Sequence, residues 1–126
     1  MKISYNVDKD LKAIFVKAEG TISVNDLIEI EKEIINNQHF ESGLNSLVDF
    51  TRAKPADNVN FHSIMKSREF VASIQHIRGP CKWAFIAPND PAYGLCKMFS
   101  AMSDGLSIES KVFRTTDEAK KWLGLE

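Results

Sequence analysis

The sequence predicts a single α/β domain with a mostly parallel sheet, and three observations lead to this fold class. Strand-like and helix-like segments alternate along the chain, which indicates βαβ units with right-handed crossovers. The first two strand-like segments are so close together that they should pair antiparallel. The length of 126 residues, with 44% apolar residues, suffices for one hydrophobic core. We expect the element order β-β-α-β-α-β-α-β-α over residues 1–126.

Five segments have strand character, being short apolar runs bounded by turn-forming residues. They span residues 3–7, 11–20, 44–50, 82–87 and 109–115. The tripeptide Asp8-Lys9-Asp10 between the first two predicts a tight turn. The fourth segment, KWAFIA, is almost continuously apolar, which is typical of a central parallel strand covered on both faces. The fifth is more polar and predicts an edge strand.

Four segments show apolar side chains at helical spacing, with recognisable start or stop signals. The first begins at Ser23, the second covers residues 57–77, the third begins at Pro91 and the fourth begins at Thr115. The second ends at Gly79-Pro80, because proline cannot continue a helix. Its predicted apolar face consists of Phe61, Ile64, Met65, Val71, Ile74 and Ile77.

Charge and composition exclude several classes of function. The 16 basic and 17 acidic side chains give a net charge of −1, without the basic excess of a nucleic-acid-binding protein. No apolar segment reaches the roughly 18 residues of a membrane-spanning helix. The N-terminal MKISYNVDKD lacks the apolar region of a signal peptide, so we expect a cytoplasmic protein. No glycine-rich phosphate-binding loop occurs, and we expect no cofactor.

The histidines and cysteines do not form a recognisable reactive site. His39, His62 and His76 lack the spacing of metal ligands, so we expect no metal. Cys81 and Cys96 lack CxxC spacing, and a structural disulfide is not expected in the cytoplasm. Cys96 is interpreted as a small buried apolar residue, since a catalytic thiol would need a nearby base.

Acid–base chemistry has no better candidate in the sequence. Glu29, Glu31 and Glu33 lie in one helix with Lys32 and are interpreted as its solvated face. No nucleophile–base pair or paired carboxylates can be assembled from spacing, so we expect no catalytic residues and no enzymatic activity.

Several local patterns, in this order of elements, resemble the STAS domain, and more closely its SpoIIAA-like branch of anti-sigma-factor antagonists. These patterns are EGTISVNDL (19–27), LVDF (47–50), WAFIAPNDPAYGLCKMF (83–99) and VFRTTDEAKKWL (112–123). The resemblance extends over nearly all 126 residues. It implies an α/β STAS fold and a regulatory module that docks a protein partner or a second copy of itself.

The chain departs from that family in one motif. Antagonist STAS proteins carry an Asp-Ser-Ser-Gly-like motif where the chain after the third strand enters its helix, and a partner kinase phosphorylates a serine there. The corresponding TRAKPADNVNFHS has no Ser-Gly pair: Thr51 comes too early, and Ser63 falls within the predicted helix. We therefore expect no serine phospho-switch at this position.

Polar residues gather where the third and fourth predicted strands end. They are Asp49, Thr51, Arg52, Lys54, Asp90 and Tyr93. Because ligands of open α/β sheets bind at the carboxyl ends of the strands, these residues are candidates for binding a ligand or partner. The alternative is that Asp49 hydrogen-bonds nearby backbone while Arg52 and Lys54 are solvated loop charges.

The second and third predicted helices carry an apolar excess that forms either a docking surface or a pocket. Its candidate residues are Phe61, Met65, Phe70, Met98, Phe99 and Met102. Apolar side chains occur in both alternation phases of KWAFIA and LKAIFV, so the second face of the sheet must be covered by curled edges, another subunit or an apolar ligand.

Three interpretations of this excess stay open. The first is docking of a protein partner or self-association. The second is carriage of a small apolar molecule such as a fatty acid, which the resemblance of this family to Sec14-type lipid-exchange domains implies. The third is a wholly internal core.

Overall fold

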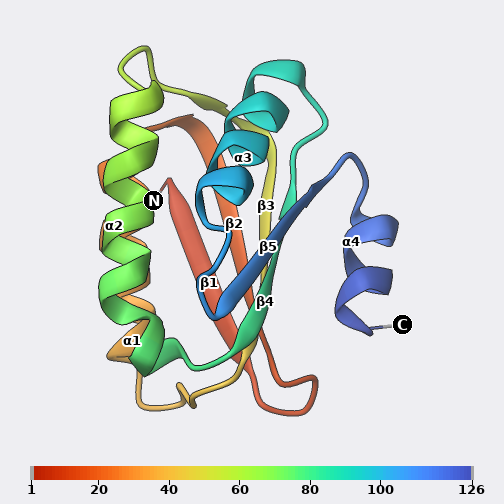
Figure 1. Ribbon diagram of the computed structural model, residues 1–126. Helices are drawn as coiled ribbons and strands as arrows, with labels where there is room; N and C mark the ends of the chain where they lie inside the picture. The colour runs from red at the N-terminus through yellow and green to blue at the C-terminus, as the bar shows by residue number, and fades with distance from the viewer. Residues whose placement is uncertain (1, 126) are drawn as a thin grey trace.

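The computed structural model describes residues 2–125 and consists of a five-stranded sheet with four helices (Figure 1). The elements in chain order are β1 (Ile3–Asp8), β2 (Ala13–Ile22), α1 (Val24–Ile35), β3 (Asn45–Pro55), α2 (Phe61–Arg78), β4 (Cys81–Ile86), α3 (Asp90–Met102), β5 (Ile108–Phe113) and α4 (Thr116–Leu123). The strand order is β1-β2-β3-β4-β5, with β1 antiparallel to β2 and the other neighbours parallel. The predicted fold class and element order are confirmed, and β5 is an edge strand.

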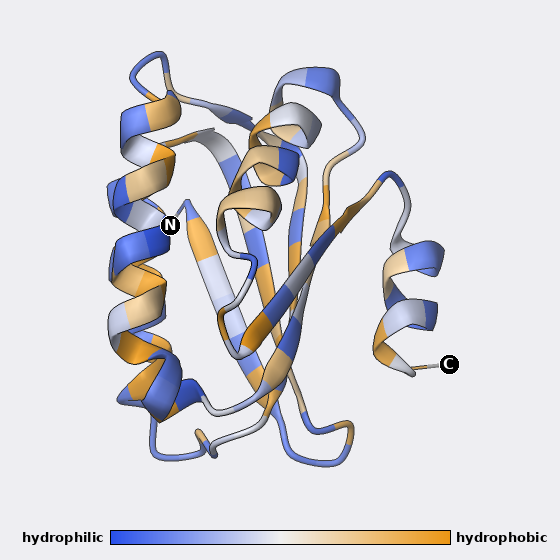
Figure 2. Ribbon diagram, viewed as in Figure 1, coloured by the Kyte–Doolittle hydropathy of each residue, from blue (hydrophilic) through white to orange (hydrophobic). Residues whose placement is uncertain are grey.

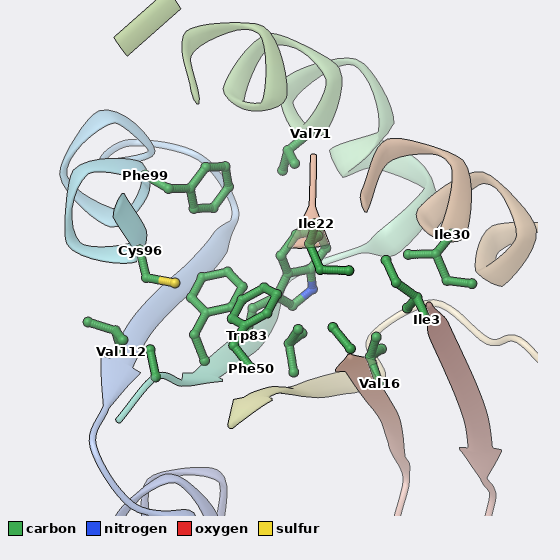
Figure 3. Packing of buried hydrophobic residues seen from close by; sticks show 14 of the residues in the cluster. Ile3, Val16, Ile22, Ile30, Phe50, Val71, Trp83, Cys96, Phe99 and Val112 are labelled. Atoms are coloured by element: carbon green, nitrogen blue, oxygen red, sulfur yellow. The ribbon is translucent and has the colours of Figure 1, made fainter. Parts of the chain in front are cut away.

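Helices cover both faces of the sheet. Figure 1 shows α1, α2 and α3 on one face and α4 on the other. The larger buried cluster lies between the sheet and the three helices (Figure 3). The smaller cluster joins Leu47, Ala84 and Ile86 of the sheet to Ala119 and Leu123 of α4. The chain's own last helix therefore covers the central part of the second face.

Capping side chains set the helix starts. Ser23 and Asp26 form a capping box at the start of α1: the Ser23 hydroxyl accepts from the Asp26 backbone N–H at 3.1 Å, and the Asp26 carboxylate accepts from the Ser23 N–H at 2.9 Å. Asn60 and Ser63 form a second capping box, so α2 begins at Phe61 and not near residue 57. Ser63 consequently lies in the first turn of α2.

The first two strands are joined by a longer turn than predicted. Residues 9–12 form the turn, and the Asp8 carboxylate accepts a hydrogen bond from the Leu11 N–H at 3.0 Å. Lys12 has a positive φ of 53°, which ends the turn just before Ala13. The predicted three-residue turn was therefore too short, and Leu11 and Lys12 do not belong to β2.

The third strand is longer than predicted, because β2 continues to Ile22 and offers it a pairing partner. Lys17 pairs with Asp49 and Glu19 with Arg52, so β3 contains a bulge of one extra residue. Pairing then continues to Pro55. The segment after residue 50 was predicted to leave the sheet, which is wrong.

The predicted apolar face of α2 is wrong in part. Ile64, Val71 and Ile74 are buried, whereas Phe61 is 52% exposed and Ile77 is 38% exposed. Hydrophilic and hydrophobic residues alternate along this helix (Figure 2). The buried face is completed at its end by a charged residue, Arg78.

Residues 2–125 lack both a membrane-spanning helix and a metal-binding cluster. No helix in this range is both long and apolar enough to cross a bilayer. The same range holds no cluster of three or more histidine, cysteine, aspartate or glutamate side chains placed to bind a metal ion.

Candidate functional site

An apolar pocket of about 150 Å³ lies between the sheet and helices α1, α2 and α3. Its floor is the helix-facing side of β3 and β4, with Val48, Phe50 and Phe85 among the lining residues. Leu27 of α1, Phe70 of α2 and Leu95 of α3 also line it and are only partly buried. Each of the three helices therefore contributes a lining side chain that is partly accessible from the surface. We call it the apolar pocket.

Figure 3 shows this region from close by, with Phe99 and Cys96 projecting from α3, Val71 from α2 and Ile30 from α1. All four residues line the pocket. Parallel strands joined by right-handed crossovers make each helix run opposite to the strands. One end of the pocket lies at the end of β3, where Pro55 lines it, and the other lies at the start of β3, where Ser46 lines it.

At the second end, four side chains form what we call the polar corner: Glu31, Ser46, Arg78 and Trp83. The Arg78 guanidinium donates to the Glu31 carboxylate at 2.8 Å, to the Ser46 hydroxyl at 2.7 Å and to the Leu44 carbonyl at 3.2 Å. Ser46 and Trp83 are register partners on β3 and β4. One guanidinium thus gathers these side chains at one end of the sheet.

Aromatic rings enclose the same guanidinium. The Arg78 Cζ atom lies 4.8 Å from the centroid of the Trp83 ring and 5.7 Å from that of Phe40. The side chain of Arg78 is 0% exposed and that of Glu31 is 12% exposed. Burial raises the pKa of Glu31, while the positive charge of Arg78 opposes this shift.

The polar corner contains a buried donor that lacks an acceptor. Trp83 lines the pocket and is 7% exposed, and its Nε1 atom has no hydrogen-bond partner within residues 2–125. Figure 3 shows this nitrogen in blue, pointing into the buried cluster. The contact of this N–H with the Cys81 thiol acts to lower the pKa of Cys81, but sulfur is a weak acceptor, and burial, which is the largest effect, still raises that pKa.

The polar candidates on β3 do not reach the apolar pocket. Ser46, Val48 and Phe50 line the pocket, so in the alternation of the strand Asp49 faces the opposite side of the sheet. The Asp49 carboxylate accepts hydrogen bonds from the backbone N–H (2.8 Å) and the hydroxyl of Thr51. This is the local backbone role that was the alternative to ligand binding.

The other polar candidates divide into two groups. Arg52 and Lys54 are exposed. Asp90 pairs with Arg114 at 2.8 Å, and the Arg114 guanidinium carbon lies 3.8 Å from the centroid of the Tyr93 ring. Both partners of that ion pair are largely solvated, since 43% of the Arg114 and 89% of the Asp90 side chain are exposed. Asp90 and Tyr93 therefore meet each other through Arg114 and not through Asp49.

The apolar candidates are mostly covered. Phe70 and Phe99 line the pocket, and Met98 and Met102 pack against the larger buried cluster. Only Phe61, of the six candidate residues, is exposed. The second and third helices therefore turn most of this apolar excess toward the pocket and the core.

Cys96 has the environment of an inert thiol. Its side chain lines the pocket and is 9% exposed, and burial raises its pKa to about 12. Since the thiolate is the nucleophilic form, this environment is unfavourable for catalysis.

The polar corner was not predicted from the sequence, and the interpretation of Glu31 as part of a solvated face is wrong. Glu31 is not part of a solvated face, because α1 turns it toward α2. A signal was present: Glu31 lies three residues before Ile34, and Arg78 lies four after Ile74, so each falls on the apolar stripe of its helix. Opposite charges on two apolar stripes indicate a buried pair.

Comparison with known proteins shows similarity at the level of three-dimensional structure. No protein-family model matches the sequence, and no curated protein matches it significantly. The crystal structure of an uncharacterised protein of the DUF3478 family from Shewanella loihica PV-4, described as having a SpoIIAA-like fold, superposes with a TM-score of 0.62 at 14% sequence identity. The match covers 96% of this chain and 93% of the other. This chain has a SpoIIAA-like fold.

In this SpoIIAA-like domain, the region where antagonists carry their motif serine is ordered by its own side chains. The Ser63 hydroxyl accepts from the Asn60 N–H at 2.8 Å and donates to the Asn60 carbonyl at 3.0 Å. Ser63 therefore completes a helix cap. The expectation that no serine phospho-switch operates there stays a prediction.

Proposed function

We propose that this SpoIIAA-like domain is a non-enzymatic module that binds a small apolar molecule in the apolar pocket. The observation that carries the proposal is the pocket itself, which lies between the sheet and three helices and is lined almost wholly by apolar side chains. Ligand pockets are typically concave and apolar with a few polar groups, and this one has the polar corner at one end.

The volume of the pocket favours a compact ligand. A protein cavity of about 150 Å³ lined by leucine, isoleucine and phenylalanine can bind benzene. The apolar pocket has the same size and kind of lining. A single ring or a short acyl chain fits such a volume better than a long fatty acid, which would have to extend out between the helices.

Toluene tests the proposal directly. We expect isothermal titration calorimetry to detect saturable binding of toluene to the native chain. Val71→Phe should abolish this binding, because Val71 lines the pocket and the phenylalanine ring would occupy the space of the ligand. The control is Ile74→Phe on the same helix, since Ile74 is buried but does not line the pocket. Circular dichroism confirms that both variants are folded. Failure of the native chain to bind any benzene-sized apolar probe contradicts the proposal.

Docking of a protein partner or a second copy is the second candidate. One observation favours it: Phe61 is 52% exposed at the start of α2. Its ring packs edge-on against that of His62, with 5.9 Å between the two ring centroids. Sedimentation equilibrium over a wide concentration range tests self-association. We expect Phe61→Ser to weaken any dimer, while Ile77→Ser, an exposed apolar position at the other end of the same helix, leaves it unchanged. A monomer at every concentration excludes self-association.

A further inference from the structure

The polar corner gives the ligand of the apolar pocket a second requirement beyond size. Trp83 Nε1–H is buried at the pocket and unpaired within the described chain. A buried donor without an acceptor is costly, by about 1–3 kcal/mol in general. An apolar molecule would leave this donor unpaired, whereas a molecule with a hydrogen-bond acceptor would satisfy it.

The charges at the polar corner select against an ionic ligand. Glu31 and Arg78 form an internal ion pair at 2.8 Å, and both side chains are largely or wholly buried. An anionic ligand at this end would lie close to the negative charge of Glu31, a residue of the pocket lining. A cationic ligand could not accept the hydrogen of Trp83 through its charged group. A neutral polar group meets neither difficulty.

A hydroxyl group is complementary to the donor and the acceptor that Trp83 and Glu31, two residues of the pocket lining, carry. Its oxygen accepts from Trp83 Nε1–H, and its hydrogen is donated to the Glu31 carboxylate, whose two oxygens can accept several hydrogen bonds. The Arg78 guanidinium donates to Glu31 at 2.8 Å, and its Cζ atom lies 4.8 Å from the centroid of the Trp83 ring, so the two residues flank one guanidinium.

We propose that the ligand is a neutral hydroxyl compound with an apolar body of about the size of benzene, such as a phenol or a short-chain alcohol. This inference rests on the proposed function, because it assigns the ligand class of the same pocket. The body occupies the space between the helices, and the hydroxyl lies at the polar corner between Trp83 and Glu31.

Phenol, toluene and benzoate are the probes that test this inference. Toluene keeps the ring and replaces the hydroxyl by a methyl group, and benzoate replaces it by a charge. At pH 7 we expect phenol to bind about tenfold more tightly than toluene, the ratio that one well-formed hydrogen bond provides, and benzoate to bind more weakly than either. Calorimetry measures the three dissociation constants.

Two substitutions localise the effect. Trp83→Phe keeps a ring for Arg78 to contact but removes the N–H, so phenol and toluene should bind this variant equally. Trp122→Phe is the matched control: Trp122 packs against Phe113, with α4 on the other face of the sheet, so the preference for phenol should persist.

A spectroscopic measurement on the native chain covers the case in which Trp83→Phe does not fold. In ¹H–¹⁵N spectra, phenol should shift the indole N–H signal of Trp83 downfield and slow its exchange, while toluene should not, and the Trp122 signal should stay constant in both. The Trp122→Phe variant assigns the two signals.

The outcomes separate this inference from the proposed function. Equal binding of phenol and toluene, as expected if a water molecule permanently occupies the polar corner, overturns the hydroxyl assignment and leaves the pocket function intact. Tighter binding of benzoate than phenol overturns the assignment in favour of an anionic ligand. No binding of any probe removes both.

Discussion

The buried guanidinium of Arg78, at the end of α2, forms a 2.8 Å ion pair with Glu31 of α1. Further donations to Ser46 and to the Leu44 carbonyl connect both helices to the start of β3. Its Nε atom has no acceptor anywhere in residues 2–125. The pair therefore fixes one end of the apolar pocket, and its stability depends on both charges remaining together.

Removing one charge should destabilise the protein more than removing both. Arg78→Met leaves the Glu31 carboxyl buried without its partner, and we expect a loss of about 3–5 kcal/mol in the free energy of unfolding. The double variant Glu31→Leu/Arg78→Met has no buried charge and should lose less. Urea denaturation at pH 7 measures both values, and a double variant that is less stable than Arg78→Met contradicts this account.

The same pair predicts a pH dependence. Because burial raises the pKa of Glu31, the folded chain binds this proton more tightly than the unfolded chain. The protonated Glu31 carboxyl contributes its full stabilisation at a pH below its pKa in the unfolded chain. This contribution decreases as the pH rises through the pKa of Glu31 in the folded chain. Relative to Glu31→Gln, the free energy of unfolding should therefore be highest at low pH and decrease as the pH rises above the ordinary pKa of a glutamate, about 4.3. A free energy of unfolding that increases with pH in this comparison would mean that the charge of Arg78 outweighs burial.

Both thiols should be unreactive in the folded protein. Burial raises the pKa of Cys96 to about 12 and also raises that of Cys81, and each is 9% exposed. With Ellman's reagent at pH 8, we expect negligible labelling of the native chain and rapid labelling of both thiols in guanidinium chloride. Cys96→Ser and Cys81→Ser identify which thiol is responsible if either reacts. Rapid labelling of native Cys96 would revive a thiol-based activity.

Gly79, which caps α2, should tolerate substitution poorly. Its φ of 72° and ψ of 169° lie in a region that is essentially restricted to glycine. A methyl group there would overlap the Ser42 hydroxyl and lie 3.1 Å from the Gly43 backbone nitrogen. We expect Gly79→Ala to cost about 3 kcal/mol or more.

Gly124 provides the matched control for that prediction. It has a similar φ of 74° but a ψ of 30°, and a methyl group would meet no described atom within 4 Å. Gly124→Ala should therefore cost only about 1 kcal/mol. Thermal unfolding compares the two variants; equal losses would show that the contact with Ser42 is unimportant.

Asp49 should affect stability and leave ligand binding unchanged, because its carboxylate binds Thr51 and faces away from the pocket. We expect Asp49→Ala to lower the free energy of unfolding by about 1 kcal/mol without changing the toluene dissociation constant. Arg52→Ala, an exposed neighbour on β3, should be nearly neutral in both measurements. Loss of toluene binding in Asp49→Ala would return this residue to the candidate site.

Local patterns in the sequence were sufficient for the elements and their order. The capping box of Ser23 and Asp26 and the Gly79-Pro80 stop signal act through hydrogen bonds and steric limits within a few residues, so they can be read without knowing the fold. The length of β3 could not be read in this way. Its last residues pair with the end of β2, a contact between segments about 30 residues apart in the chain.

The sequence by itself determined the α/β class, the antiparallel first strand and the apolar excess of α2 and α3, because hydrophobic periodicity reflects burial on one face of an element. Only the tertiary structure decided where that excess points, which residues meet at the polar corner and which side of the sheet Asp49 occupies. Glu31 and Arg78 are 47 residues apart, so the charge of one is neutralised by a neighbour that local sequence does not reveal. The apolar pocket likewise exists because three helices and a sheet do not fill all the space between them, a property of their packing and not of any one segment.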